Sequence, residues 1–129
     1  MPLTRITLND QTSEARIAQI SDILQRTLVE TFDVPAHDRF QIVEKLPAAQ
    51  RIYDPHYLSG RRSDDVILFT LLAGKPRSAA QKSAFCRTLT QRLAAQLAVR
   101  PDDVMVVIQF NTAGDWSFSK GEMFAGETL

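Results

Sequence analysis

The feature that most constrains the fold of this chain is an internal repeat, in which a strand, a capped helix and a second strand follow one another twice. The second copy is offset by about 64 to 66 residues, so that Pro2 corresponds to Val66 and Thr12 to Ser78. The expected elements are a strand at 2–8, a helix from Thr12 to about Phe32, a strand at 40–46, a strand at 66–72, a helix between Ser78 and Pro101, and a strand at 104–108.

The two expected helices are recognised by apolar residues that recur at helical spacing. Their stripes are Ile17, Ile20, Leu24 and Leu28 in the first, and Phe85, Leu89, Leu93 and Leu97 in the second. Pro35 ends the first helix, because proline disfavours helical geometry in the residue before it. Ser78 followed by Gln81 predicts a capping box at the start of the second helix.

Two β-α-β units predict an α+β fold, in which a mixed four-stranded sheet carries both helices on one face. The other face is then bare. The segments 66–72 and 104–108 are too apolar to face water there, so we expect a partner copy to cover this face and the chain to form a homo-oligomer. The connection at 47–63 is expected to be a long loop with one short strand at Ile52–Tyr53.

The composition fits one small domain and argues against several classes of protein. The 129 residues carry 15 basic and 15 acidic side chains, which suits a single domain, 1–129, built from halves at about 2–63 and 64–129. Zero net charge gives no electrostatic signature of a nucleic-acid partner. No apolar run is long enough for a membrane helix. The single cysteine, Cys86, excludes an internal disulfide, and we expect a cytoplasmic protein.

The sequence lacks the motifs that hold common cofactors. It contains no glycine-rich phosphate loop, no zinc-protease motif, no nucleophile elbow and no paired Cys/His ligands. The two histidines, His37 and His56, are separated by a loop and have no companion ligands. We therefore expect neither a metal site nor a cofactor.

Pro2 is the candidate residue with the most distinctive chemistry. Removal of Met1 would expose a prolyl amine, the one secondary amine that an ordinary chain can present. Such an amine is a base when neutral, and it is a proton donor or an iminium former when it engages a carbonyl compound. Proline is also a common second residue, so the position alone does not establish catalysis.

Three further segments carry candidate site residues. Asp38 follows the turn after the first helix, where an ordinary turn aspartate would also fit. Lys75 and Arg77 lie between the end of an expected strand and the start of an expected helix. They could form an anion-binding site there, or they could be an ordinary basic turn exposed to solvent. Trp116 and Phe118 share one face of an extended segment. They could form the wall of a pocket, or they could lie in the core of a subunit interface.

Taken together, these positions resemble the tautomerase superfamily, and most closely its malonate semialdehyde decarboxylase branch. The likeness runs over nearly the whole chain, and the matching pieces are Pro2, the segment 34–41, Pro76-Arg77-Ser78 with Gln81-Lys82, the segment 101–104 and the segment 115–118. The resemblance implies a tautomerase-like β-α-β repeat whose chains assemble into trimers. It also implies a pocket near the subunit boundaries that holds an amino-terminal proline.

The resemblance also implies roles for individual residues. Pro2 would be the catalytic amine, Asp38 its acidic partner, and Arg77 the binder of the substrate carboxylate. Lys75 stands where the decarboxylases usually have a second arginine, and it keeps the charge while losing the planar fork of hydrogen-bond donors. The apolar wall of the substrate site would comprise Trp116, Phe118, Phe124 and Leu129.

The leading hypothesis is a cofactor-independent carbon–carbon lyase that decarboxylates a small 3-oxo acid resembling malonate semialdehyde. Pro2 would donate a proton to the carbonyl oxygen or form an iminium, while Asp38 would polarise a water. One alternative is an isomerase, a keto–enol tautomerase with neutral Pro2, or a hydratase, acting on 2-oxo acids. The other is a non-catalytic ligand-binding or assembly module, which a retained Met1 would favour. The expected partners are the oxo acid and further copies of the chain.

Overall fold

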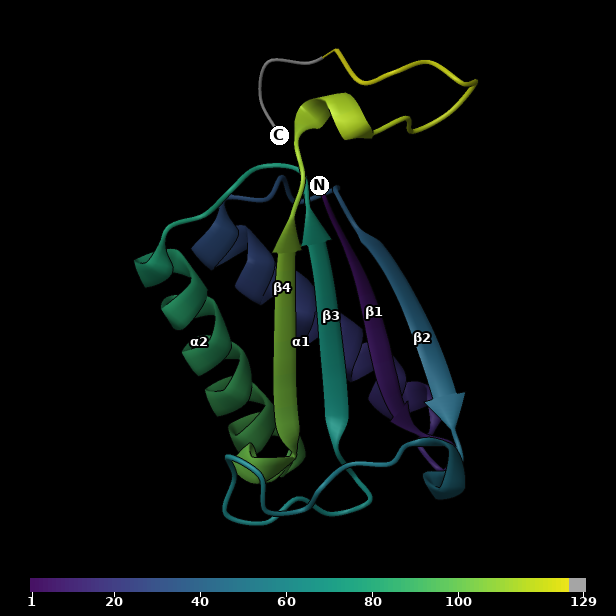
Figure 1. Ribbon diagram of the computed structural model, residues 1–129, viewed down its shortest axis with the longest axis vertical. Helices are drawn as coiled ribbons and strands as arrows, with labels where there is room; N and C mark the ends of the chain where they lie inside the picture. The colour runs from purple at the N-terminus through teal and green to yellow at the C-terminus, as the bar shows by residue number, and fades with distance from the viewer. Residues whose placement is uncertain (126–129) are drawn as a thin grey trace.

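The computed structural model describes residues 1–125, in which two α-helices pack on one side of a four-stranded sheet (Figure 1). The strands are β1 (Pro2–Asn9), β2 (Phe40–Leu46), β3 (Ile67–Ala73) and β4 (Val104–Phe110), and the helices are α1 (Glu14–Phe32) and α2 (Ala79–Leu97). Short 3₁₀ turns occupy Ala48–Gln50, Pro101–Asp103 and Ala113–Asp115.

The sheet has the order β2-β1-β3-β4 and mixed strand directions. β1 runs parallel to β2 and antiparallel to β3, and β3 runs parallel to β4. Leu3 lies opposite Phe40 in the first unit, and Ile67 lies opposite Val104 at the corresponding place in the second. The predicted fold class, a mixed four-stranded sheet built from two β-α-β units, is therefore confirmed.

The helix ends follow from local capping chemistry. Ser13 caps α1, since its hydroxyl accepts a hydrogen bond from the backbone N–H of Arg16. The predicted start at Thr12 is one residue too early, because the Thr12 hydroxyl instead donates to the carbonyl of Asn9 at 2.7 Å. The predicted capping box of α2 is present, with Ser78 and Gln81 each bonded to the backbone of the other.

The hydrophobic core fills the space between the two helices and the sheet. Alternate residues of each strand point toward the helices, as Ile6 and Leu8 do on β1 and Phe69 and Leu71 do on β3. Each helix contributes its apolar stripe to the core. The stripes meet at Phe32 of α1 and Phe85 of α2, whose ring centroids lie 5.0 Å apart. The burial of these stripes holds both helices on the same face.

Within residues 1–125, the opposite face of the sheet carries no covering layer. Phe40 and Ile42 on β2 are 47% and 41% exposed, and Met105 and Val107 on β4 are 36% and 44% exposed. These residues are large and apolar, so the face has the composition of a protein interface. The apolar character of the segment 104–108 therefore does not reflect burial on both faces within one chain.

The connection between β2 and β3 differs from its prediction, because Ile52 and Tyr53 do not form a strand. The Ile52 side chain is 92% exposed. Beside it, the Arg51 side chain crosses to β1 and β3 and donates to the carbonyls of Thr7 at 3.3 Å and Val66 at 2.5 Å. A side chain, and not a backbone ladder, therefore fixes this loop to the sheet.

Within the same described residues, neither helix combines the length and the apolar character that crossing a membrane requires.

The core packing predicts the cost of a cavity at Leu24, which is fully buried on α1. Replacing Leu24 by Ala should lower the free energy of unfolding by about 2–5 kcal/mol, because the transfer free energy is lost and a cavity remains. Urea denaturation followed by circular dichroism measures the change. Leu58→Ala is the matched control, since Leu58 is 85% exposed and its replacement should change stability by about 0.5 kcal/mol or less. Equal losses in the two variants would contradict this account of the core.

Candidate active site

Four segments that are distant in sequence meet at one end of the sheet (Figure 1). They are the start of β1, the loop between α1 and β2, the turn after β3, and the segment that follows β4. Backbone hydrogen bonds join three of them, since Gly74 donates to the Met1 carbonyl at 3.1 Å and Asn111 donates to the Ala73 carbonyl at 2.9 Å. Pro2 lies directly opposite Ala73 in the sheet. Within the described residues, these four segments carry the predicted site residues Pro2, Asp38, Lys75, Arg77, Trp116, Phe118 and Phe124.

Asp38 lies beside the amino terminus of the chain, with its side chain only 14% exposed. Its Oδ2 accepts a hydrogen bond from the ammonium group of Met1, which forms a salt bridge with it. Its Oδ1 is buried and has no hydrogen-bond partner among the described residues. The carboxylate therefore faces the chain terminus and retains unused acceptor capacity next to Pro2.

The loop that carries Asp38 is held by Gln25, a buried polar residue of α1. The Gln25 amide donates to the carbonyl of Asp38 at 3.0 Å and to that of Ala36 at 3.4 Å. The Asp38 N–H in turn donates to the carbonyl of Pro35 at 3.0 Å. Sequence reasoning missed Gln25, and its place directly beside Leu24 on the buried arc of the helix was the available signal.

Arg77 is buried at the carboxyl end of α1, where it is 8% exposed. Its Nε and Nη2 both donate to the Phe32 carbonyl, at 3.2 and 2.7 Å, and its Nη1 donates to the Lys75 carbonyl at 2.6 Å. A guanidinium has five N–H groups, so one N–H on each terminal nitrogen has no acceptor within the described part of the chain. The cation is thus fixed in place while donors remain for an anion.

The charge of Arg77 is supported by its surroundings. Burial lowers the pKa of Arg77, while the carboxylates of Asp33 and Asp38 raise that pKa and oppose the effect of burial. The carbonyls that terminate α1 also carry partial negative charge, which favours a cation there. Arg77 is therefore protonated at any physiological pH.

Lys75 occupies the turn between β3 and α2, and its side chain is exposed to solvent. Its backbone carbonyl, rather than its ammonium, is what contacts Arg77. In this chain the backbone of Lys75 therefore helps to hold Arg77 in place.

An aromatic cluster lies over the segment that follows β4. Trp116 and Phe118 stack with ring centroids 5.7 Å apart, and Phe124 meets Phe118 edge-on at 5.5 Å. The Trp116 indole donates to the Asn111 side chain at 2.7 Å, and the Phe124 N–H donates to the Trp116 carbonyl at 2.7 Å. These bonds bring together three of the four residues predicted as an apolar wall. The fourth, Leu129, lies outside the described residues.

Phe40 is a further member of this aromatic cluster, and sequence reasoning assigned it only to a strand. Its ring centroid lies 5.7 Å from that of Phe118. Because Phe40 is opposite Leu3 in the sheet, it connects the cluster to the start of β1. The alternation of residues along β2 was the signal that could have placed it on the uncovered face.

In the part of the chain that the structure describes, no three His, Cys, Asp or Glu side chains gather as potential metal ligands. His37 is exposed beside Asp38. His56 lies in the connection between β2 and β3, where its Nδ1 is 3.2 Å from the Gly60 carbonyl oxygen.

Comparison with known proteins identifies relatives across most of the chain. A family model described as "Tautomerase enzyme" matches residues 38–119. The protein named probable tautomerase YusQ from Bacillus subtilis (strain 168) is 31% identical over 121 residues, which cover 94% of this chain and 95% of that protein.

Solved structures show the same relationship. A crystal structure of malonate semialdehyde decarboxylase, an enzyme described with decarboxylase and hydratase activities, is 33% identical, has a TM-score of 0.87, and matches 93% of this chain and 92% of its own. The R7 fused 4-OT, an asymmetric trimer, is 21% identical with a TM-score of 0.75 over 94% of both chains, and shares the fold. The predicted similarity to malonate semialdehyde decarboxylase is thus confirmed.

The position of Gln25 predicts a measurable loss of stability. Gln25→Leu leaves the carbonyls of Ala36 and Asp38 without their donor, so the free energy of unfolding should fall by about 1–3 kcal/mol. Urea denaturation measures it. The matched control is Gln91→Leu on the exposed side of α2, which should change stability by about 0.5 kcal/mol or less. A Gln25→Leu variant as stable as this control would show that the two hydrogen bonds are dispensable.

Proposed function

Because the chain belongs to the tautomerase family, we propose that it is a cofactor-independent decarboxylase of a small 3-oxo acid, acting through the amine of Pro2 once Met1 is removed. One observation carries this proposal. The terminal ammonium of the chain is paired with Asp38, and Asp38 lies close enough to the buried Arg77 to influence its pKa. These two contacts support a site in which the terminal amine, the Asp38 carboxylate and the Arg77 cation act together.

Met1 determines whether this amine is free. In the structure Met1 is 4% exposed, its ammonium bonds to Asp38, and its carbonyl accepts from Gly74. The nitrogen of Pro2 is then part of a peptide bond and has no basic lone pair. Removal of Met1 gives Pro2 its own ammonium group and releases Asp38 from its partner.

Arg77 is the proposed binder of the substrate carboxylate. Its carbonyl contacts fix the guanidinium, and the remaining N–H on each terminal nitrogen can bind the two oxygens of a carboxylate. In this proposal the aromatic cluster of Phe40, Trp116, Phe118 and Phe124 supplies the apolar surface of the site. Such surface disfavours the charged carboxylate relative to the neutral carbon dioxide that leaves.

The reaction then balances with one proton from solvent. The bond between the carboxylate carbon and the α-carbon breaks, carbon dioxide leaves, and the electron pair passes into the carbonyl. Its oxygen takes the proton of Pro2 and an enol forms. The α-carbon next takes a proton from water, which Asp38 orients, while the enol oxygen returns its proton to Pro2. An iminium formed between Pro2 and the carbonyl carbon would accept the same electron pair.

Keto–enol tautomerisation of a 2-oxo acid is the second candidate function. The exposed side chain of Lys75 favours it, since a site with a single buried arginine grips the carboxylate less firmly than one with two. The Bacillus subtilis relative is also named a probable tautomerase. In this case a neutral Pro2 would carry a proton between the carbon and the oxygen of the substrate, and no carbon dioxide would form.

The uncovered sheet face supports the proposal that the protein is a homotrimer, as its structural neighbour R7 fused 4-OT is a trimer. Val107 is apolar and 44% exposed on this face. Val107→Asp should convert the trimer to smaller species, because association would bury an unpaired charge. Light scattering during size-exclusion chromatography measures the mass. Leu58→Asp, a change in the exposed loop, should leave the trimer intact, and a monomeric unaltered protein would contradict the proposal.

The catalytic proposal predicts that Pro2→Ala and Arg77→Lys each lower kcat/KM for decarboxylation of malonate semialdehyde by about 10²-fold or more. The first change alters the amine, and the second keeps the charge while removing the fork of donors. Carbon dioxide release measures the rate, and circular dichroism verifies folding. Pro47→Ala is the matched control and should retain full activity. A fully active Pro2→Ala variant would refute the role of the prolyl amine.

The two candidate functions are separated by their products and by the state of the amine. Decarboxylation releases carbon dioxide from a 3-oxo acid, whereas tautomerisation interconverts an enol and a 2-oxo acid without loss of carbon. Intact-mass spectrometry after borohydride reduction with each substrate reports Met1 removal and any iminium on Pro2. Activity from a chain that retains Met1 would contradict both.

A further inference from the structure

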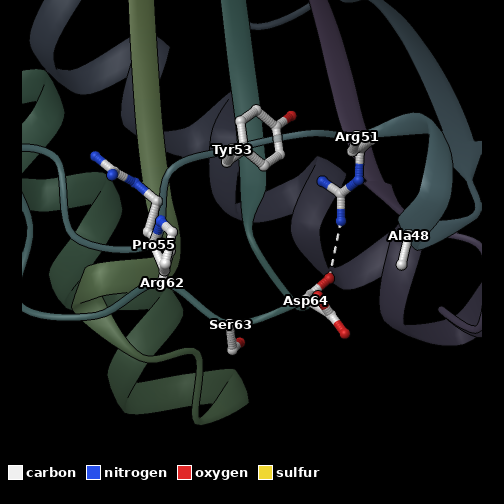
Figure 2. A pocket seen from close by; sticks show the side chains of 7 residues that line it. All are labelled: Ala48, Arg51, Tyr53, Pro55, Arg62, Ser63 and Asp64. Atoms are coloured by element: carbon white, nitrogen blue, oxygen red, sulfur yellow. Dashed lines mark hydrogen bonds between the residues drawn. The ribbon is translucent and has the colours of Figure 1, made fainter.

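A polar cavity lies at the connection between β2 and β3, with its lining side chains drawn in Figure 2. This connection is at the opposite end of the sheet from the amino terminus (Figure 1). It has a volume of about 180 Å³, and its lining includes Arg51, Tyr53, Arg62, Ser63 and Asp64. Figure 2 shows Arg51 between Tyr53 and Ala48, with Arg62 on the other side of Tyr53. Two cations therefore border a small hollow that the proposed decarboxylation does not use.

Arg51 is the best-defined group in this cavity. Its Nη1 donates to the carbonyls of Thr7 and Val66, and its Nη2 donates to the carbonyl of Asp64 at 2.9 Å, the dashed bond in Figure 2. Its Nε is buried and has no hydrogen-bond partner among the described residues. Since a buried donor without an acceptor is unfavourable, the Nε–H and the second N–H of Nη2 form an edge of the guanidinium that can receive a ligand.

The charges around this edge favour an anion. Within the described residues, neither Arg51 nor Arg62 forms a salt bridge with a carboxylate. Arg62 bonds instead to the carbonyls of Asp54 at 3.0 Å and Tyr57 at 2.6 Å. Carbonyl groups hold a guanidinium in place without neutralising its charge. The nearby carboxylates are those of Asp54, Asp64 and Asp103, of which Asp64 is exposed. Hydrogen bonds from the backbone of His56 and Tyr57, and to a smaller extent the charge of Arg62, lower the pKa of Asp54. Asp103 accepts from Ser63 at 2.7 Å and from Arg100 at 3.5 Å. Among the described residues none of these carboxylates forms a salt bridge with Arg51, so the edge of Arg51 still favours an anion.

The internal repeat places the start of β3 here. The start of β3 occupies the place in the second unit that the start of β1 occupies in the first, as the matching registers show. Val66, just before β3, lies within the chain, and its N–H donates to the Ser63 carbonyl at 3.4 Å. The backbone nitrogen at this place is therefore an amide and not a terminal amine.

We propose that this cavity is a second, non-catalytic site that binds a small carboxylate. The ligand's two oxygens accept from Nε and Nη2 of Arg51 in the parallel arrangement that guanidinium and carboxylate groups adopt, and Arg62 adds a second positive charge at the rim. Because Nε is shielded from solvent, binding requires a small rotation of the side chains around it. The volume of the cavity restricts the ligand to a few heavy atoms.

The test is a titration of the isotope-labelled full-length protein with sodium malonate at constant ionic strength, followed by nuclear magnetic resonance. Backbone amides of Arg51 and Ser63 report the second cavity, and the indole N–H of Trp116 separately reports the site near Pro2. We expect saturable shifts at Arg51 and Ser63 with a Kd on the order of 1 mM. The absence of saturable shifts at these two residues would overturn the proposal, whatever happens at Trp116.

Matched variants assign the binding to the two arginines. Arg62→Gln should raise the Kd at Arg51 and Ser63 by about five-fold, and Arg51→Lys should abolish the shifts by removing the forked donors. Arg61→Gln makes the same charge change on an exposed neighbour that does not line the cavity, and should leave the Kd unchanged. If Arg51→Lys fails to fold, Arg62→Gln still tests the proposal, because an unaltered Kd in the Arg62→Gln variant refutes the site. Binding of inorganic phosphate without binding of malonate would refute the carboxylate assignment.

Discussion

Burial of both helices against the same face of one sheet is the constraint on which the rest of this structure depends. The apolar stripes of α1 and α2 have a single surface on which to pack, and the core formed by Leu24, Phe69 and Phe85 fills the space between them. With the helices fixed there, the strand ends and their loops can meet only at the two ends of the sheet. One end collects Pro2, Asp38 and Arg77, and the other collects the loop that contains Arg51.

The carboxyl half of α1 organises the candidate active site. Gln25 holds the carbonyl of Asp38, and the carbonyl of Phe32 accepts two bonds from Arg77. Asp33, in the left-handed conformation at φ 54°, turns the chain out of the helix and places its carboxylate where it favours the charged form of Arg77. The acidic and basic members of the site are therefore both attached to one helix, although they lie on different loops.

Much of this architecture could be predicted from local patterns. Helical stripes, the capping box at Ser78 and the strand segments each follow from interactions between residues close in sequence, and the repeat supplied their order. The error at Ile52–Tyr53 arose because a β-branched or aromatic pair forms a strand only beside a free strand edge. In this loop the Arg51 side chain, and not a strand, attaches the chain to the sheet. This contact is between residues far apart in sequence, so local composition does not predict it.

The candidate residues of the site could be named from the sequence, but the contacts that support them could not. Pro2, Asp38 and Arg77 each had an ordinary structural explanation, and it was their combined order and spacing, which resemble the tautomerase superfamily, that singled them out. Gln25, Phe40 and the carbonyl of Phe32 contribute through contacts that exist only after folding, so their residue types carried no comparable signal.

The attachment of Arg77 to the last carbonyl of α1 ties the orientation of this cation to the hydrophobic core. Phe32 is 1% exposed, and its ring centroid lies 5.0 Å from that of Phe85, so its carbonyl cannot shift far without disturbing the packing between the two helices. Such a shift would withdraw the acceptor from Nε and Nη2 of Arg77 at once. Heating should consequently release the guanidinium of Arg77 together with the loss of the native circular dichroism spectrum, and not before it.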